Sequence, residues 1–178
     1  MNKTITVIRR GTSAEATGNP AIEIPVLNSH YKKDILSILT ILSEKKVKFL
    51  LVGAYAMAIH GYPRSTIEID ILVMPNAENA LLVLQALDKF GAPIGYLPVE
   101  DLQKEGSIFQ IGTAPCRIDI LTSIDGLKFE DAFARSQIME IEGIPIHVLS
   151  IPDLIINKRA TGKTEDLADA EMLENASG

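Results

Sequence analysis

The stretch from Leu50 to Val73, LLVGAYAMAIHGYPRSTIEIDILV, decides the fold of this chain. It predicts a buried strand ending at Gly53, a short helix, a loop containing Arg64, and a second strand. In the second strand Glu68 and Asp70 alternate with apolar residues, so both carboxylates point to the same face. Two carboxylates held this close raise each other's pKa unless a cation lies between them. The pattern therefore indicates a metal site.

A third carboxylate lies on a later predicted strand. Residues 117–121, RIDIL, alternate strictly and place Asp119 between two isoleucines. If this strand pairs beside the strand of Glu68 and Asp70, the three carboxylates converge, because neighbouring strands lie about 4.8 Å apart. Such oxygens suit Mg²⁺, and two ions would clamp the attacking and leaving oxygens of a phosphoryl or nucleotidyl displacement. The ordinary alternative is the solvated acidic face of an edge strand.

Three basic or flexible positions are candidates for binding phosphate. Gly53 lets the backbone approach a phosphate, and the helix that follows offers unpaired N–H groups to an anion. Arg64 precedes the acidic strand and could bind a triphosphate bidentately. Lys158, on a late helix with Arg159 and Lys163 nearby, could close over the same phosphates. Each also has a plainer interpretation, as a strand-to-helix turn, a solvated loop residue and a basic helix end.

Strands alternate with helices over the rest of the chain. Helices are expected at 31–45, 54–59, 77–90, 129–135, 151–162 and 165–174, and strands at 4–8, 49–52, 67–73, 107–111, 117–121, 138–141 and 144–148. This alternation predicts an α/β or α+β fold with a mixed central β-sheet flanked by helices. Residues 1–28, with many small residues and prolines, are expected to form an N-terminal extension, and 29–178 the domain. Asp166 and Asp169 of the last helix are expected to be exposed or to pair with Arg159 and Lys163.

Composition excludes several classes of protein. The longest apolar runs are too short to cross a bilayer, and no secretory signal is visible at the N-terminus. A single cysteine, Cys116, excludes an internal disulfide and suits a reducing compartment, so a cytoplasmic protein without a membrane partner is expected. The net charge of −6 argues against broad binding of nucleic acid through its phosphates. The three histidines lie far apart without paired cysteines, which excludes a standard zinc motif.

The combination of Gly53-Ala54, Glu68-Ile69-Asp70 and the later Asp119 resembles the polymerase-β-like nucleotidyltransferase superfamily. In that superfamily a glycine followed by Gly or Ser opens a helix, a strand carries two acidic residues, and a third acid completes the metal site. More narrowly, GAYAMAIHGYPRSTIEIDILV and NKRATGKTEDLADAEML are similar to a bacterial group related to abortive-infection (AbiEii-like) toxins and minimal nucleotidyltransferases. The resemblance spans roughly residues 48–173.

This resemblance implies a nucleotidyltransferase fold with C-terminal helices. It implies transfer of a nucleotidyl group from a nucleoside triphosphate to an acceptor hydroxyl on an RNA, a protein or a small molecule. The carboxylates expected to be catalytic and to bind Mg²⁺ or Mn²⁺ are Glu68, Asp70 and Asp119. The residues expected to bind the triphosphate are Gly53, Ala54, Arg64, Thr66 and Lys158.

Two residues depart from the superfamily pattern. Ala54 lacks the hydroxyl that a serine would offer to a phosphate, and Glu68 is one methylene longer than the usual aspartate, although Mg²⁺ demands near-octahedral placement of its ligands. These departures leave open a second hypothesis, a catalytically degenerate binding module that acts through a partner protein, as in a toxin–antitoxin pair, or as a homo-oligomer. A third hypothesis is a phosphohydrolase that uses the same carboxylates.

Overall fold

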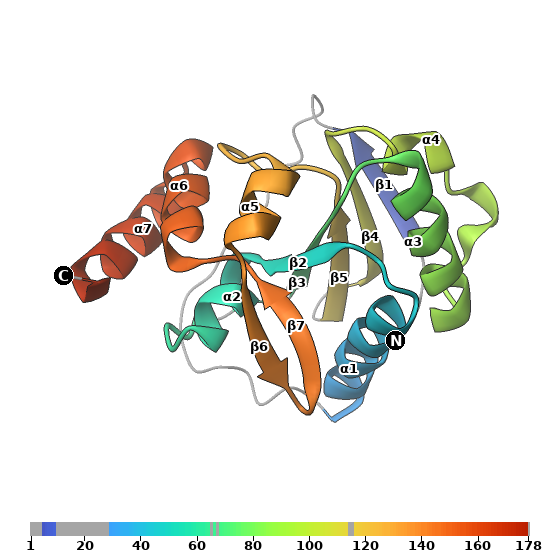
Figure 1. The fold of residues 1–178 in the computed structure, drawn as a ribbon, viewed down its shortest axis with the longest axis horizontal. Helices are drawn as coiled ribbons and strands as arrows, with labels where there is room; N and C mark the ends of the chain where they lie inside the picture. Colours follow the sequence, from blue (N-terminus) through green and yellow to red (C-terminus); the bar gives the residue numbers. More distant parts are fainter. Residues whose placement is uncertain (1–4, 10–28, 65, 67, 114–115, 178) are drawn as a thin grey trace.

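A computed structural model describes residues 5–9, 29–64, 66, 68–113 and 116–177 (Figure 1). Within these ranges the strands are β1 (Ile5–Arg9), β2 (Phe49–Val52), β3 (Glu68–Val73), β4 (Ser107–Thr113), β5 (Cys116–Leu121), β6 (Gln137–Ile141) and β7 (Ile144–Val148). The helices are α1 (Ser29–Glu44), α2 (Gly53–Ile59), α3 (Ala77–Phe90), α4 (Val99–Leu102), α5 (Phe129–Arg135), α6 (Ile151–Thr161) and α7 (Thr164–Ser177), with a 3-10 turn, η1, at Ile94–Tyr96. None of the helices in the described part of the chain is long and apolar enough to cross a membrane.

The strands form a single mixed sheet in the order β1-β4-β5-β3-β2-β7-β6. At its centre β3 runs parallel to β5 and antiparallel to β2. The predicted mixed α/β architecture is thereby confirmed. β1, from the predicted extension, pairs antiparallel with β4 at one edge of the sheet. The remainder of that extension, residues 10–28, and the predicted strand position Ile67 lie outside the described residues.

Local sequence signals explain where the elements begin and end. The side chain of Asn76 accepts a hydrogen bond from the backbone N–H of Asn79 at 2.8 Å, which caps α3, and Gly91 ends this helix with a left-handed φ of 81°. The β6–β7 hairpin turns through Glu142 and Gly143, whose φ values are 50° and 81°. Two consecutive positive φ values are typical of the tight turn that joins antiparallel strands.

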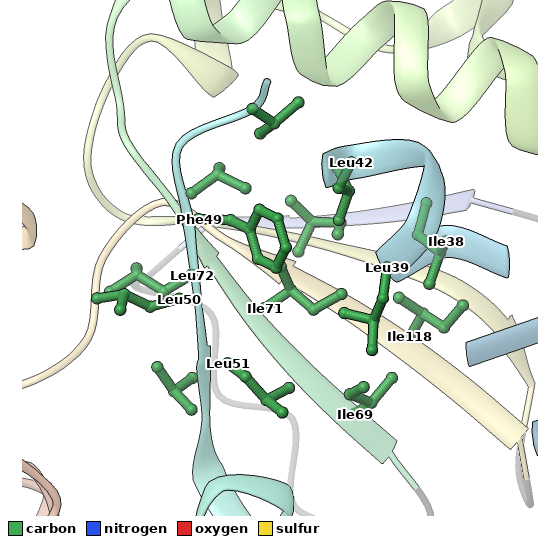
Figure 2. Close-up of a cluster of buried hydrophobic side chains, with 14 of the residues drawn as sticks. Ile38, Leu39, Leu42, Phe49, Leu50, Leu51, Ile69, Ile71, Leu72 and Ile118 are labelled. Atoms are coloured by element: carbon green, nitrogen blue, oxygen red, sulfur yellow. The ribbon is translucent and has the colours of Figure 1, made fainter. Parts of the chain in front are cut away.

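The central core lies between α1 and one face of the sheet (Figure 2). Apolar side chains of β3 and β5 pack there against apolar side chains of α1, and each is at most 1% exposed: Ile38, Leu39, Leu42, Ile69, Ile71 and Ile118. Burying one such side chain stabilises the fold by about 1.5–3 kcal/mol. Because side chains alternate along a strand, fixing the isoleucines on this face turns Glu68, Asp70 and Asp119 to the opposite face.

Candidate active site

The parallel pairing of β3 with β5 brings the three predicted carboxylates together. Asp70 lies directly across from Asp119 in this ladder, and Glu68 lies two residues before Asp70 on the same face. One carboxylate oxygen from each residue lies within 4.8 Å of the others. Asp119 is buried, whereas Glu68 and Asp70 are partly exposed. The three side chains therefore form a compact acidic cluster that solvent can reach from one side.

Asp70 is the member of the cluster with the most perturbed chemistry. Burial, reinforced by repulsion from Glu68 and Asp119, raises the pKa of Asp70 to about 8. Among the described residues its carboxylate has no hydrogen-bond or ion-pair partner. A carboxylate kept in such surroundings either holds a proton or requires a cation.

Gly53 makes room for this carboxylate. It follows β2 directly with a φ of 66°, and a Cβ atom built on it would lie 2.2 Å from Oδ2 of Asp70. No side chain fits there, so the position requires glycine for two reasons, the left-handed backbone and the contact with Asp70. Ala54 follows in the first turn of α2 and is partly exposed. The glycine turn and the acidic cluster are therefore in direct contact.

Arg117 is a member of the site that the sequence analysis missed. Its Nε donates to Oδ1 of Asp119 at 2.7 Å, and its Nη2 donates to Oδ2 of Asp119 at 3.1 Å and to Oε2 of Glu68. Gln110 of β4 also donates to Oδ2 of Asp119, at 3.1 Å. The same spacing rule that paired Glu68 with Asp70 would have found Arg117, because it lies two residues before Asp119 on the same face of β5.

The guanidinium of Arg117 offsets part of the charge of the cluster. Burial raises the pKa of Glu68, and the positive charge of Arg117 opposes that rise without cancelling it. Three carboxylates and one guanidinium leave the cluster with excess negative charge when all four are ionised. The arrangement retains an attraction for a further cation.

The predicted phosphate-binding residues Arg64 and Lys158 lie close together, and both form ion pairs with α7. Asp169 of α7 forms an ion pair with Arg64, and Nζ of Lys158 lies 3.0 Å from the same carboxylate. Glu165 pairs with Arg64 at 2.8 Å. Lys158 is buried, and its charge reaches Asp70, where it opposes the raised pKa. The two cations therefore lie on the acidic side of the sheet.

The expectation for Asp166 and Asp169 of α7 was wrong. Asp169 is only 8% exposed and pairs with Arg64 and Lys158 rather than with Arg159 or Lys163. Asp166 accepts hydrogen bonds from Lys158 and from the hydroxyl of Thr161. Burial would raise the pKa of Asp166, but these two hydrogen bonds and the positive charges of Lys158 and Lys163 outweigh it, so its pKa lies below the ordinary value. A helical wheel drawn for α7 alone misses these partners, because they come from the β3 approach and from α6.

Thr66 contacts the start of β3. Its hydroxyl donates to the backbone carbonyl of Glu68 at 3.1 Å and accepts from the backbone N–H of Glu68 at 3.3 Å. These bonds fix the backbone of the first metal-ligand candidate. His60, at the end of α2, contacts the carbonyl of Leu149 through Nε2 at 2.8 Å.

A surface cavity of about 510 Å³ lies away from these residues, between the loop after β5 and α6. None of the predicted site residues lines it. Its two cations are already paired, Lys128 with Glu105 at 2.9 Å and Arg135 with the buried Asp153 at 2.9 Å. The acidic cluster beside Gly53 is therefore the stronger candidate for chemistry.

Comparison with known proteins agrees with this geometry. A protein from Thermotoga maritima described as a nucleotidyltransferase has 18% identity and a TM-score of 0.54, over 84% of this chain and 94% of that one. The solution structure of the antibiotic-resistance factor ANT(2'')-Ia has 16% identity and a TM-score of 0.54, over 86% of each chain. A crystal structure of ANT(2'')-Ia in complex with adenylyl-2''-tobramycin has 15% identity and a TM-score of 0.54, over 85% of this chain and 91% of that one.

At these identities the likeness shows the fold, and it confirms the predicted nucleotidyltransferase fold. A comparison with curated proteins gave no match. The model of one sequence family, described as "Nucleotidyl transferase of unknown function (DUF2204)", matches residues 31–177. That match includes the glycine turn, the three carboxylates, Arg117 and both C-terminal helices. The chain therefore belongs to this family of nucleotidyl transferases.

Proposed function

We propose that this protein is a metal-dependent nucleotidyltransferase, which takes a nucleoside triphosphate and transfers its nucleotidyl group to an acceptor hydroxyl. One observation carries the proposal. The carboxylate of Asp70 lies between Glu68 and Asp119 with a pKa of about 8 and no partner among the described residues, beside a glycine turn that leaves no room for a side chain. This environment favours binding of a cation over ionisation without one.

The residues present fit a hard divalent cation. All three groups are carboxylates, the ligand type that Mg²⁺ and Mn²⁺ prefer, and their oxygens are close enough to share one ion or two. Glu68, Asp70 and Asp119 would hold the metal. When bound, it would neutralise charge on the phosphates and activate the acceptor oxygen. Hydrogen bonds between the hydroxyl of Thr66 and the backbone of Glu68 fix the position from which the longer side chain of Glu68 would reach the ion.

The remaining site residues have distinct proposed roles. Gly53 and Ala54 would let the backbone approach the triphosphate. Arg64 and Lys158 would neutralise the leaving pyrophosphate, and Thr66 would add a contact near the start of β3. Asp119 would accept the proton of the acceptor hydroxyl on a carboxylate oxygen. The chain would thus separate metal binding on the strands from phosphate binding on the turn and α6.

The acceptor belongs to the class of hydroxyl-bearing molecules, on an RNA, a protein or a small molecule. ANT(2'')-Ia, whose fold this chain shares, was crystallised with adenylyl-2''-tobramycin, which favours a small-molecule hydroxyl as the first acceptor to test. The similarity of GAYAMAIHGYPRSTIEIDILV and NKRATGKTEDLADAEML to a bacterial group related to abortive-infection toxins favours a toxin–antitoxin context. We place the reaction in the cytoplasm, where nucleoside triphosphates are abundant and the thiol of Cys116 would remain reduced.

Labelled nucleoside triphosphates incubated with candidate acceptors test the proposal. Product should form with Mg²⁺ or Mn²⁺, disappear with a chelator, and disappear in Asp70→Asn. Glu140→Gln is the matched control, because Glu140 is an exposed carboxylate on β6, outside the acidic cluster. Equal product from wild type and Asp70→Asn would contradict the assignment of the catalytic carboxylates.

Arg117 favours one alternative function, a binding module that has lost turnover. Its guanidinium already contacts Glu68 and Asp119, and Ala54 lacks a hydroxyl for phosphate. In that case a partner protein or a second copy of the chain would be the ligand. Calorimetry with ATP separates the two functions, because a degenerate module should show no increase in nucleotide affinity when Mg²⁺ is added.

A further inference from the structure

The carboxylates assigned to the metal already share a cation that belongs to the protein. Both oxygens of Asp119 accept hydrogen bonds from Arg117, at 2.7 Å and 3.1 Å, and Oε2 of Glu68 accepts a third. A divalent cation at Glu68 and Asp119 would need oxygens from the same two groups. It would also lie close to a guanidinium of like charge, which repels it.

The position of Arg117 lets its guanidinium move away from Glu68 without a large desolvation cost. Its side chain is 25% exposed and that of Glu68 is 32% exposed, whereas Asp119 is 6% exposed. A guanidinium that is partly in water can rotate away from Glu68, because its charge remains solvated as it moves. The ion pair with Glu68 is therefore the more easily broken of the two.

Resting on the function proposed above, we propose that Arg117 is the competitor of the divalent cation at Glu68 and Asp119. In the metal-free protein it is their counter-ion, and it gives up Glu68 when the cation binds. Asp70, which Arg117 does not contact, receives the cation without competition. Arg117 is then a positioning residue that sets the metal concentration at which the site fills.

Calorimetric titration of the full chain with Mn²⁺ and with Mg²⁺ tests this role. Arg117→Gln should bind each cation about tenfold more tightly than wild type, which is about 1.4 kcal/mol. In a chelator the same variant should unfold at a lower temperature than wild type, because Glu68 and Asp119 lose their counter-ion, and saturating Mn²⁺ should raise its Tm by more than it raises that of wild type.

Two further variants distinguish competition from simple support of the carboxylates. Gln110→Ala removes a neutral donor from Oδ2 of Asp119 without removing a positive charge, so its metal affinity should equal or fall below that of wild type. Arg117→Lys keeps the charge but loses the planar fork, so its metal affinity should lie between wild type and Arg117→Gln. If Arg117→Gln does not fold in chelator, the titration of Arg117→Lys decides the question.

The outcomes separate this inference from the proposed function. Metal binding by wild type that neither Arg117→Gln nor Arg117→Lys tightens overturns the role of Arg117 and leaves the metal site intact. Metal binding that is unchanged in Asp70→Asn overturns the proposed site itself. If Arg117→Gln binds the metal and wild type does not, Arg117 excludes the cation completely, which supports the competition most strongly. Absence of binding in all these proteins overturns both proposals.

Discussion

Arg117 of β5 lies directly across from Glu68 of β3, two residues along the parallel ladder from the pair Asp119 and Asp70. The ladder thus sets a base against an acid and an acid against an acid on the same face of the sheet. The guanidinium of Arg117 contacts both Glu68 and Asp119, while Asp70 is left without a partner among the described residues. The site is therefore asymmetric, with its unsatisfied charge concentrated on the carboxylate that contacts Gly53.

Replacing Gly53 by alanine should destabilise the protein more than replacing an equivalent glycine elsewhere. Gly162 is the matched control, since its φ of 67° equals that of Gly53 within a degree and a Cβ there meets nothing within 4 Å. Gly162→Ala should cost about 1–2 kcal/mol for the left-handed backbone alone. Gly53→Ala should cost about 1–3 kcal/mol more, because its Cβ overlaps Asp70. Urea unfolding measures both.

A double variant locates the cause of that excess. Combining Gly53→Ala with Asp70→Ala removes the carboxyl oxygen that a Cβ at position 53 would strike. When Asp70 is already alanine, adding Gly53→Ala should therefore lower the free energy of unfolding by little more than Gly162→Ala does in wild type. If Gly53→Ala and Gly162→Ala are equally destabilising, the close approach of Gly53 to Asp70 is wrong.

The metal-free protein should lose stability as the pH rises, and Asp70 should be the main reason. Its pKa is raised to about 8 in the folded state, whereas an unfolded aspartate titrates near 3.9. Between about pH 4 and pH 8 the folded state binds more protons than the unfolded state, so the free energy of unfolding falls by up to about 1.4 kcal/mol per pH unit. The raised pKa of Glu68 acts in the same direction.

Asp70→Asn should remove most of this slope. In chelator its free energy of unfolding should exceed that of wild type by a margin that widens from pH 5 to pH 8. Added Mg²⁺ should narrow the margin at pH 8, since the ionised carboxylate then has its cation. Denaturant unfolding at both pH values provides the measurement, and parallel pH profiles for wild type and Asp70→Asn would show that Asp70 is not the responsible group.

Sequence alone predicted the strands of the site because their signals are local. Alternation of apolar and acidic residues fixed the faces of β3 and β5, and the isoleucines buried against α1 enforce that choice. The pairing of β3 with β5 was only a condition in the prediction, since strand order depends on contacts distant in the chain. The structure meets that condition, and the three carboxylates converge.

The partners of the basic residues could not be predicted from local pattern. Arg64 and Lys158 were expected to face the phosphates, and nothing in the local pattern of residues indicated that Asp169 would contact both. That contact depends on how α7 packs against α6 and the approach to β3. The ion pair of Arg117 with Glu68 likewise joins two neighbouring strands, and these two residues are 49 positions apart in sequence. Long-range ion pairs of this kind follow from topology and not from periodicity.

Asp169 should contribute more to stability than Glu165, although both pair with Arg64. The side chain of Asp169 is 10% exposed and also contacts the buried Lys158, whereas that of Glu165 is 72% exposed. Asp169→Asn leaves two cations without their shared carboxylate and should cost about 2–4 kcal/mol. Glu165→Gln should change stability by less than about 1 kcal/mol. Equal effects in denaturant unfolding would show that the buried position of Asp169 carries no energetic weight.

Lys158 and Arg159 are neighbours on α6, but only Lys158 is expected to contribute to nucleotide binding. Lys158 is buried and its charge reaches Asp70, while Arg159 lies on the surface and pairs with Glu174 at 2.6 Å. Lys158→Gln should weaken binding of a nucleoside triphosphate by about tenfold to a hundredfold, the loss expected for a hydrogen bond to a charged group. Arg159→Gln should leave the affinity unchanged.

Calorimetry with a non-hydrolysable triphosphate and Mg²⁺ measures both affinities, with circular dichroism to establish that each variant is folded. Lys158→Arg provides a second test, because it retains a positive charge near Asp166 and Asp169 and should bind the triphosphate better than Lys158→Gln does. The ion pairs of Lys158 with α7 hold its ammonium in place before any ligand arrives. If Lys158→Gln folds and binds the triphosphate as tightly as Arg159→Gln, those pairs are its whole function and the phosphates are bound elsewhere.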